Sequence, residues 1–196
     1  MNSKKIIVDI LLFILMIIEY SRQYLNPTIH EIIGICLIVL VIIHLYLNRK
    51  YLKSIGKGKY NLKRKLMLFI NIGFMVVFIL TCTFGLVSGQ FINMGNLTAI
   101  YLHKTFAYLS IILLGLHLSF NINILINKIP HKKIIFPILI VFGIYCLAKV
   151  DFWNHLIGKY GLSIGGENIF INSIYYIGIV LMIIALVNLD KLIENK

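Results

Sequence analysis

Four of the six histidines in this chain form two pairs with the same spacing. His30 and His44 are fourteen positions apart in one apolar stretch, and His103 and His117 are fourteen positions apart in another. Fourteen residues of α-helix return to within about 40° of the starting direction and rise about 21 Å. Each stretch, as a helix, therefore presents two imidazoles on one face near opposite ends. A single histidine in an apolar helix is usually a packing residue or lines a polar cavity, but a repeated pair is harder to explain that way.

Two such helices side by side offer two stacked pairs of imidazoles, which is what two six-coordinate haems need. Haem iron takes neutral imidazole, and helix bundles hold such cofactors between facing helices. We therefore expect two non-covalent haem b groups, with His30 and His103 as ligands of an outer iron and His44 and His117 as ligands of an inner one. Zinc is a poor fit, because ligands about 21 Å apart along a helix cannot share one ion.

Composition sets the class of protein. The chain has 196 residues, of which 60% are hydrophobic and 13% charged, and this indicates an all-α integral membrane protein. A net charge of +12 would suggest nucleic acid binding in a soluble protein. Here the basic residues gather in short loops between apolar runs, so we expect membrane lipid and no nucleic acid as a partner. The cysteines form no CxxC or CxxCH motif, so a haem would be held without thioether bonds.

Six apolar runs have roughly the length needed to cross a hydrocarbon core of about 30 Å. They cover residues 4–20, 28–48, 66–88, 100–122, 134–150 and 171–189. We expect residues 1–196 to form a single multi-pass membrane domain of about six transmembrane helices. Its haem-binding core, a four-helix bundle like that of di-haem cytochrome b, covers about residues 4–124, and two further helices lie within 134–189.

The distribution of lysine and arginine predicts the orientation of these spans. With the N-terminus inside, fifteen of the nineteen basic residues fall on the inner side. Both termini are then cytoplasmic in a chain of the cytoplasmic membrane. Spans two and four both run from outside to inside, so the expected pairing is His30 with His103 and His44 with His117. The basic loop 49–65 is explained by topology alone, and binding of anionic lipid or an acidic partner is the alternative.

The start of the second span carries helix-capping signals. Asn26 or Thr28 can cap the helix, Pro27 suits its first turn, and Thr28-x-x-Glu31 has the form of a capping box. We therefore interpret Glu31 as a capping carboxylate rather than as a group that orients an imidazole. In the same way, Asp9 is expected to be a carboxylate near the inner interface rather than a proton relay.

Small residues accompany the histidines. Gly34 and Ala107 each follow an outer histidine by four positions, and Gly85 and Gly89 share a face of the third span. These residues either let a flat macrocycle approach the backbone or simply allow close helix packing. The pattern does not separate the two interpretations.

The remaining two histidines fall in predicted loops. His131 and His155 have no expected partners and are interpreted as solvated loop residues. Trp153, His155 and Glu167 lie in the loop 151–172, where an enzyme of this class could hold a substrate pocket. That loop contains no specific motif, so its role stays open.

The histidine-bearing segments resemble known membrane cytochromes. The spacing looks like that of b-type cytochromes of quinol-oxidising complexes, and several motifs resemble the flavinylation-associated membrane cytochromes of bacteria. The motifs are His30-Glu31-x-x-Gly34, His44-x-x-x-Asn48, Ser88-Gly89, His103 with Ala107, Gly115-x-His117 and Gly143-Ile-Tyr-Cys-Leu-Ala-Lys149-Val-Asp151. The resemblance covers nearly the full chain. It implies an extracytoplasmic partner protein that carries covalently attached flavin mononucleotide, because the chain itself has no flavin-attachment pattern.

These observations predict a b-type di-haem membrane cytochrome that carries electrons across the bacterial cytoplasmic membrane, with an extracytoplasmic flavoprotein as the expected acceptor. Such a chain is an electron-transfer subunit rather than a stand-alone enzyme, and a quinone is a further candidate partner. Two alternatives stay open. One is a quinol-oxidising or metal-reducing membrane oxidoreductase subunit, and the other is a non-haem transporter or structural membrane protein.

Overall fold

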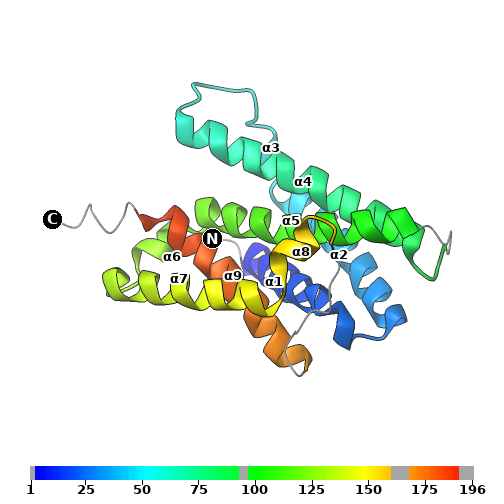
Figure 1. The fold of residues 1–196 in the computed structure, drawn as a ribbon. Helices are drawn as coiled ribbons and strands as arrows, with labels where there is room; N and C mark the ends of the chain where they lie inside the picture. Colours follow the sequence, from blue (N-terminus) through cyan, green and yellow to red (C-terminus); the bar gives the residue numbers. More distant parts are fainter. Residues whose placement is uncertain (1–2, 93–96, 160–167, 190–196) are drawn as a thin grey trace.

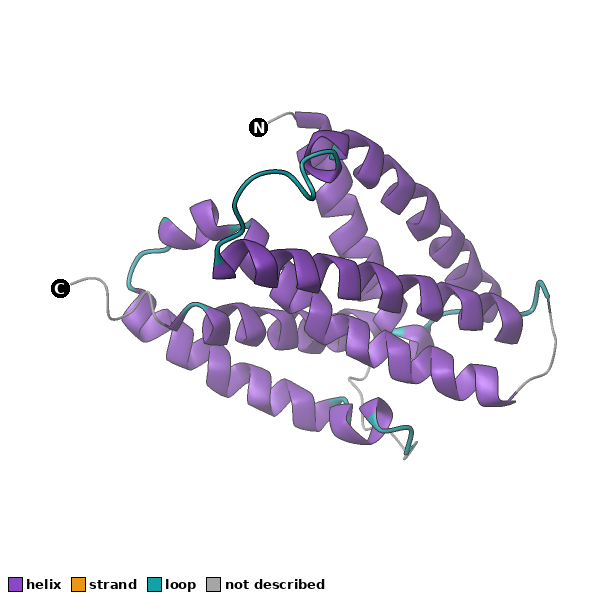
Figure 2. Ribbon diagram, turned by 90° about the horizontal axis from the view of Figure 1, so that it is seen from above, coloured by secondary structure: helices purple, strands orange, loops and turns teal. Residues whose placement is uncertain are grey.

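The computed structural model describes residues 3–92, 97–159 and 168–189, which form helices and no strand (Figures 1 and 2). The helices are α1 (Ser3–Tyr20), η1 (Arg22–Tyr24), α2 (Pro27–Leu47), α3 (Arg49–Leu52), α4 (Leu62–Ser88), α5 (Leu97–Asn121), α6 (Asn123–Asn127), α7 (Lys132–Lys149), α8 (Phe152–Leu156) and α9 (Ile169–Val187). The prediction of an all-α chain is confirmed. Each of the six predicted spans coincides with a helix to within a few residues.

Four helices are long and apolar enough to cross a membrane, namely α2, α4, α5 and α9. The other two candidates, α1 and α7, are each 18 residues long. Both carry charged residues within those bounds, including Asp9 and Glu19 in α1 and Lys149 in α7. Charges at membrane depth are costly unless they are paired or reach the interface. The structure therefore supports a membrane protein with four candidate spans, and the count of six stays a prediction.

Helix α9 packs mainly on three other helices, and α4 packs on one of those three. In Figure 1, α4 runs along α5 and α7 lies beside α9, and α5 and α1 also contact α9. The side chains of Ile111, Cys146 and Ile179 at these contacts are fully buried. The backbones of α7 and α9 approach closely at Gly143, because a methyl group there would collide with Met182. Glycine at a helix contact is a common way for membrane helices to pack.

Helix α2 lies at the edge of the bundle and packs mainly on α1. Leu37 is its one fully buried side chain, whereas Val39 and Ile42 are 51% and 62% exposed. An exposed apolar helix face of this extent is a liability in water but suits contact with lipid tails. The exposed faces of α2 are therefore apolar and suited to contact with lipid, whereas its histidines face the neighbouring helices.

Buried polar side chains tie α1 to its neighbours. Tyr20 and Ser110 share a hydrogen bond of 2.7 Å between α1 and α5. The Asn172 amide of α9 donates to the Ser21 hydroxyl at 3.2 Å. Polar pairs of this kind help to fix helix positions inside a membrane, where an unpaired polar group is costly. These contacts hold the C-terminal end of α1, and Ser21 directly after it, against the rest of the bundle.

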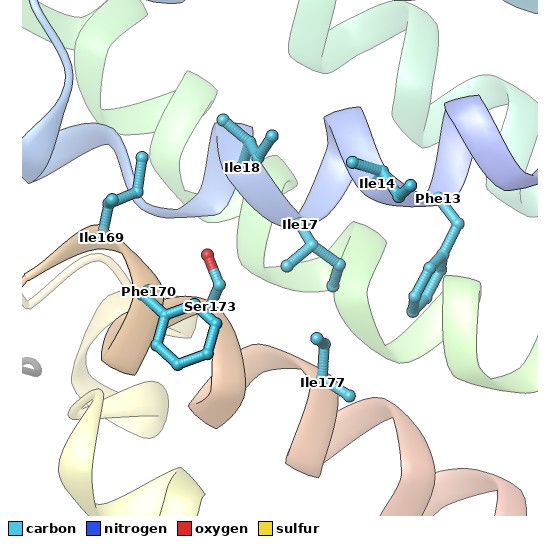
Figure 3. A pocket seen from close by; sticks show the side chains of 8 residues that line it. All are labelled: Phe13, Ile14, Ile17, Ile18, Ile169, Phe170, Ser173 and Ile177. Atoms are coloured by element: carbon cyan, nitrogen blue, oxygen red, sulfur yellow. The ribbon is translucent and has the colours of Figure 1, made fainter.

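An apolar groove lies between α1 and α9 (Figure 3). Its lining residues are Phe13, Ile14, Ile17, Ile18, Ile169, Phe170, Ser173 and Ile177. None of the four paired histidines contributes to it, and Ser173 is its one polar lining residue. The chemistry predicted from the sequence therefore lies elsewhere in the bundle.

Candidate functional site

The first pair of histidines meets between α2 and α5. The ring centroids of His30 and His103 are 6.0 Å apart, and their planes are nearly perpendicular at 80°. A metal–imidazole bond of about 2 Å on each side, added to the half-widths of two rings, gives a centroid separation of about 6 Å. The two rings are therefore spaced as the axial ligands of one metal would be.

The second pair lies further along the same two helices. Asn71, which faces His117, also donates to the Tyr51 hydroxyl of α3, directly after α2, so the late parts of α2 and α5 lie at the same end of the bundle. The Phe74 ring of α4 covers His117 from another side, with 5.5 Å between the ring centroids. The structure thus places the rings of the first pair side by side, and it places His44 and His117 further along α2 and α5, which run in the same direction. It does not bring all four histidines to a single point.

Helix α1 places a carboxylate beside each histidine of α2. Asp9 Oδ1 accepts a hydrogen bond of 2.7 Å from His44 Nδ1. Glu19 Oε2 lies 2.8 Å from His30 Nδ1. That second contact is not aligned as a hydrogen bond, and His30 Nδ1 is buried without another hydrogen-bond partner among the described residues. Because α1 and α2 are antiparallel, the early residue of α1 reaches the late histidine of α2.

Helix α4 places an uncharged oxygen beside each histidine of α5. His103 Nδ1 donates to the Thr81 backbone carbonyl at 2.8 Å. His117 Nδ1 lies 2.9 Å from the Asn71 side-chain oxygen, which accepts its proton. The α4–α5 hairpin therefore repeats the arrangement of the α1–α2 hairpin.

All four histidines consequently present Nδ1 to an oxygen. In a neutral imidazole only one nitrogen carries a proton, so a proton on Nδ1 leaves the Nε2 lone pair free to bind a metal. Histidine ligands of metals commonly have this partner on the other nitrogen, which fixes the tautomer and the ring orientation. At His44 the Asn48 amide donates a long hydrogen bond to Nε2, at 3.4 Å, which a metal bound at Nε2 would replace. The residues present fit an axial haem ligand set in both layers.

Sequence reasoning missed these four acceptors as partners of the histidines. Asp9 was expected to be an interfacial carboxylate, and the structure shows it bound to His44. Glu19 and Asn71 carry no local signal of this role, because each meets its histidine only after two helices pack. The Thr81 acceptor is a backbone carbonyl, which any residue type would supply. No spacing within one helix identifies these partners, because they depend on how the helices pack.

Gly85 makes room for the His103 ring. A methyl group at Gly85 would lie 2.9 Å from two atoms of that ring, closer than side chains normally approach. Gly73, on the same helix, faces open space. Of the two interpretations of the third-span glycines, Gly85 fits close helix packing, because it admits a side chain of the neighbouring helix α5.

The capping prediction for α2 is half right. The Asn26 side chain accepts a hydrogen bond of 2.9 Å from Thr28 N, so Asn26 is the cap. Glu31 does not close a capping box. Its carboxylate instead accepts from the backbone N–H groups of Gln90 and Phe91, the latter at 3.2 Å. Glu31 therefore anchors the first turn of α2 to the chain that follows α4.

The interpretation of His155 as a solvated loop residue is wrong. It belongs to α8, and its ring stacks on Tyr108 of α5 with the centroids 4.7 Å apart. His131 precedes α7 with a left-handed backbone, φ 48°. Part of the loop 151–172, including Glu167, lies outside the described residues, so the proposed pocket there cannot be built from them.

Within residues 3–92, 97–159 and 168–189, no three histidine, cysteine, aspartate or glutamate side chains gather in a way that could hold a metal ion. Each layer supplies two imidazoles, so a metal bound there needs its other ligands from a cofactor. A porphyrin ring supplies that set. Comparisons with family models, with curated proteins and with solved structures find no match to this chain.

Proposed function

We propose that this chain is a b-type di-haem membrane cytochrome that carries electrons across the bacterial cytoplasmic membrane. The observation that carries the proposal is the pairing of four histidines in two layers, each with Nδ1 against an oxygen. His30 and His103 would hold the outer haem, and His44 and His117 the inner one. A haem held in this way supplies a one-electron Fe(III)/Fe(II) couple.

The residues of this chain perform the structural part of that function. The parallel helices α2 and α5 keep the two layers at opposite ends of the bundle, because each histidine pair is separated by about 21 Å of helix. Hydrogen bonds to oxygens on α1 and α4 fix the tautomers and orientations of the His44, His103 and His117 rings. The Glu19 carboxylate lies beside the fourth ring, that of His30. The apolar outer face of α2 and its neighbours keeps the bundle in lipid, away from water.

The proposal includes a topology of six spans with both termini in the cytoplasm. The excess of lysine and arginine on one side supports this orientation. On the same reasoning, α1 and α7 would span the membrane with their charged residues near its surfaces or paired inside the bundle. In α1, Asp9 and Glu19 have such partners in His44 and His30.

The proposed electron acceptor is an extracytoplasmic protein that carries flavin mononucleotide, with a quinone as a further candidate partner. This part rests on the resemblance of the histidine-bearing segments to flavinylation-associated cytochromes. The outer layer, His30 and His103, would then face the side on which such a protein resides. The chain is in this proposal an electron-transfer subunit and not a stand-alone enzyme.

Reconstituted vesicles test transmembrane electron transfer. The full chain in liposomes that enclose ferricyanide should reduce the trapped ferricyanide when dithionite is added outside, since neither ion crosses the lipid. We expect His117→Ala to fall to the rate of protein-free vesicles, because one of the two layers is lost. His131→Ala, which lies outside both layers, is the matched control and should keep the full rate. Equal rates for the unmodified protein and for protein-free vesicles would contradict the proposed function.

A further inference from the structure

The four oxygens that face the histidines divide into two kinds according to their helix. Both oxygens on α1 belong to carboxylates, those of Asp9 and Glu19. Both acceptors on α4 are neutral, the Asn71 amide and the Thr81 carbonyl. Since α1 serves α2 and α4 serves α5, each layer combines one imidazole beside a carboxylate with one beside a neutral oxygen.

We propose that α1 is a tuning helix, in which Asp9 and Glu19 act as positioning residues that lower the reduction potentials of the inner and the outer haem respectively. This inference rests on the proposed function. It assigns a role to two acidic residues that are not themselves ligands. Each acts through the histidine that it contacts, so the charge of each carboxylate affects one layer.

The contact at the inner layer is held in place from both sides. Asp9 Oδ1 lies 2.7 Å from His44 Nδ1. One turn earlier on α1, the Lys5 ammonium donates to the Asn48 side-chain oxygen at 3.0 Å. The Asn48 amide in turn donates to the His44 backbone carbonyl at 3.0 Å. The end of α2 and the start of α1 are thus fastened together around the His44 ring, so the carboxylate keeps its position.

Charge decides the direction of the effect. A carboxylate that accepts the Nδ1 proton makes the imidazole a more basic ligand. A more basic ligand and a nearby negative charge both favour the more positive ferric iron, so they lower the potential. A neutral amide or carbonyl orients the ring without adding charge. At His44 both effects apply, because Asp9 accepts the Nδ1 proton. At His30 the nearby charge of Glu19 acts without an aligned hydrogen bond.

Exposure differs between the two carboxylates. The Asp9 side chain is 49% exposed, whereas the Glu19 side chain is 14% exposed. Water and ions screen an exposed charge more than a buried one, but burial also favours the neutral form of a carboxylic acid. These two effects oppose each other at Glu19, so we expect the clearer shift from Asp9, whose carboxylate also accepts a hydrogen bond from His44.

Redox titration of the full-length protein with bound haem tests the inference. Asp9→Asn keeps an oxygen in place to accept the hydrogen bond and removes the charge. We expect one of the two one-electron transitions to move to higher potential. The equilibrium constant for reduction of that haem should rise about tenfold, which corresponds to 59 mV for a one-electron couple. The other transition and the haem content should stay unchanged. Asn71→Asp adds a charge on the opposite side of the same layer and should move the same transition to lower potential.

Further variants assign the transitions and guard against misfolding. In a His103→Ala background, which keeps only the inner pair, the remaining transition should be the one that Asp9→Asn moves. Glu19→Gln should move the other transition in the same direction. Unchanged haem content in each variant shows that it is folded. Two results would overturn the tuning role and leave the proposed function standing. One is Asp9→Asn protein that binds haem but shows no shift in either transition. The other is a shift in Asn71→Asp in the same direction as in Asp9→Asn. Protein that binds no haem would overturn both the tuning role and the proposed function.

Discussion

His103→Ala is expected to lower the haem content from about two per chain to about one. In the proposed site, His103 would supply one of the two protein ligands of the outer haem, and its ring is fixed by the Thr81 carbonyl at 2.8 Å. Without that imidazole, only His30 would remain to hold the outer haem. The inner pair is formed by other residues about 21 Å away along the helices, so it should keep its haem. Extraction and quantification of haem against protein concentration measures the change.

The remaining haem also serves as the folding control for this variant. It should keep the spectrum of a six-coordinate b-type haem, because its two ligands, His44 and His117, are untouched. His117→Ala is the reciprocal variant and should leave the outer haem in place. His155→Ala, which removes a ring stacked on Tyr108 outside both layers, should retain both haems. Simultaneous loss of both haems in a folded His103→Ala protein would show that the layers are not independent.

Gly85→Ala has the second largest expected effect, although it changes no ligand. The added methyl group would lie 2.9 Å from two atoms of the His103 ring. That ring is held by the Thr81 carbonyl one turn earlier on the same helix, so it cannot move away freely. Overpacking a well-filled site costs about 1–3 kcal/mol. We expect partial loss of the outer haem and a lower unfolding temperature, measured by haem quantification and by thermal melting in detergent.

Gly73→Ala is the matched control on the same helix. A methyl group at Gly73 meets no atom within 4 Å. Alanine also favours a helix over glycine by about 1 kcal/mol, so this variant should be as stable as the unmodified protein or slightly more so. Normal binding of the outer haem in Gly85→Ala would contradict this expectation, because haem binding would then not depend on the position of the His103 ring against α4.

The two-layer arrangement could be predicted from the sequence because it depends on the geometry of single helices. A spacing of fourteen residues in each of two segments already requires stacked pairs once the helices are parallel. The structure places the His30 and His103 rings 6.0 Å apart, as the pairing requires. All-α architecture likewise follows from apolar runs of helical length, and the structure confirms it.

Contacts between different helices could not be predicted in the same way. Glu31 has the spacing of a capping box, but in the folded chain its carboxylate binds backbone N–H groups of Gln90 and Phe91, sixty residues away. His155 lies in a segment that looks like a loop, yet α8 folds onto α5 and stacks its ring on Tyr108. Both outcomes depend on how hairpins dock, which local patterns do not encode.

The acceptors of the histidines show the same limit. The positions of Asp9 and Glu19 in a short apolar helix do not indicate which residues they contact. Their partners become visible only when α1 lies antiparallel to α2, so that each carboxylate meets one imidazole. This contact also gives a physical reason for two charges in a helix that would otherwise be too polar for the membrane.

Haem quantification on the unmodified protein, together with oxidised and dithionite-reduced visible spectra, tests the central claim most directly. The account predicts a red protein with about two haems per chain, extractable without breaking covalent bonds, and a reduced α band in the b-type region. Colourless protein that is folded and helical would contradict the account, because the two layers of histidines would then have another purpose.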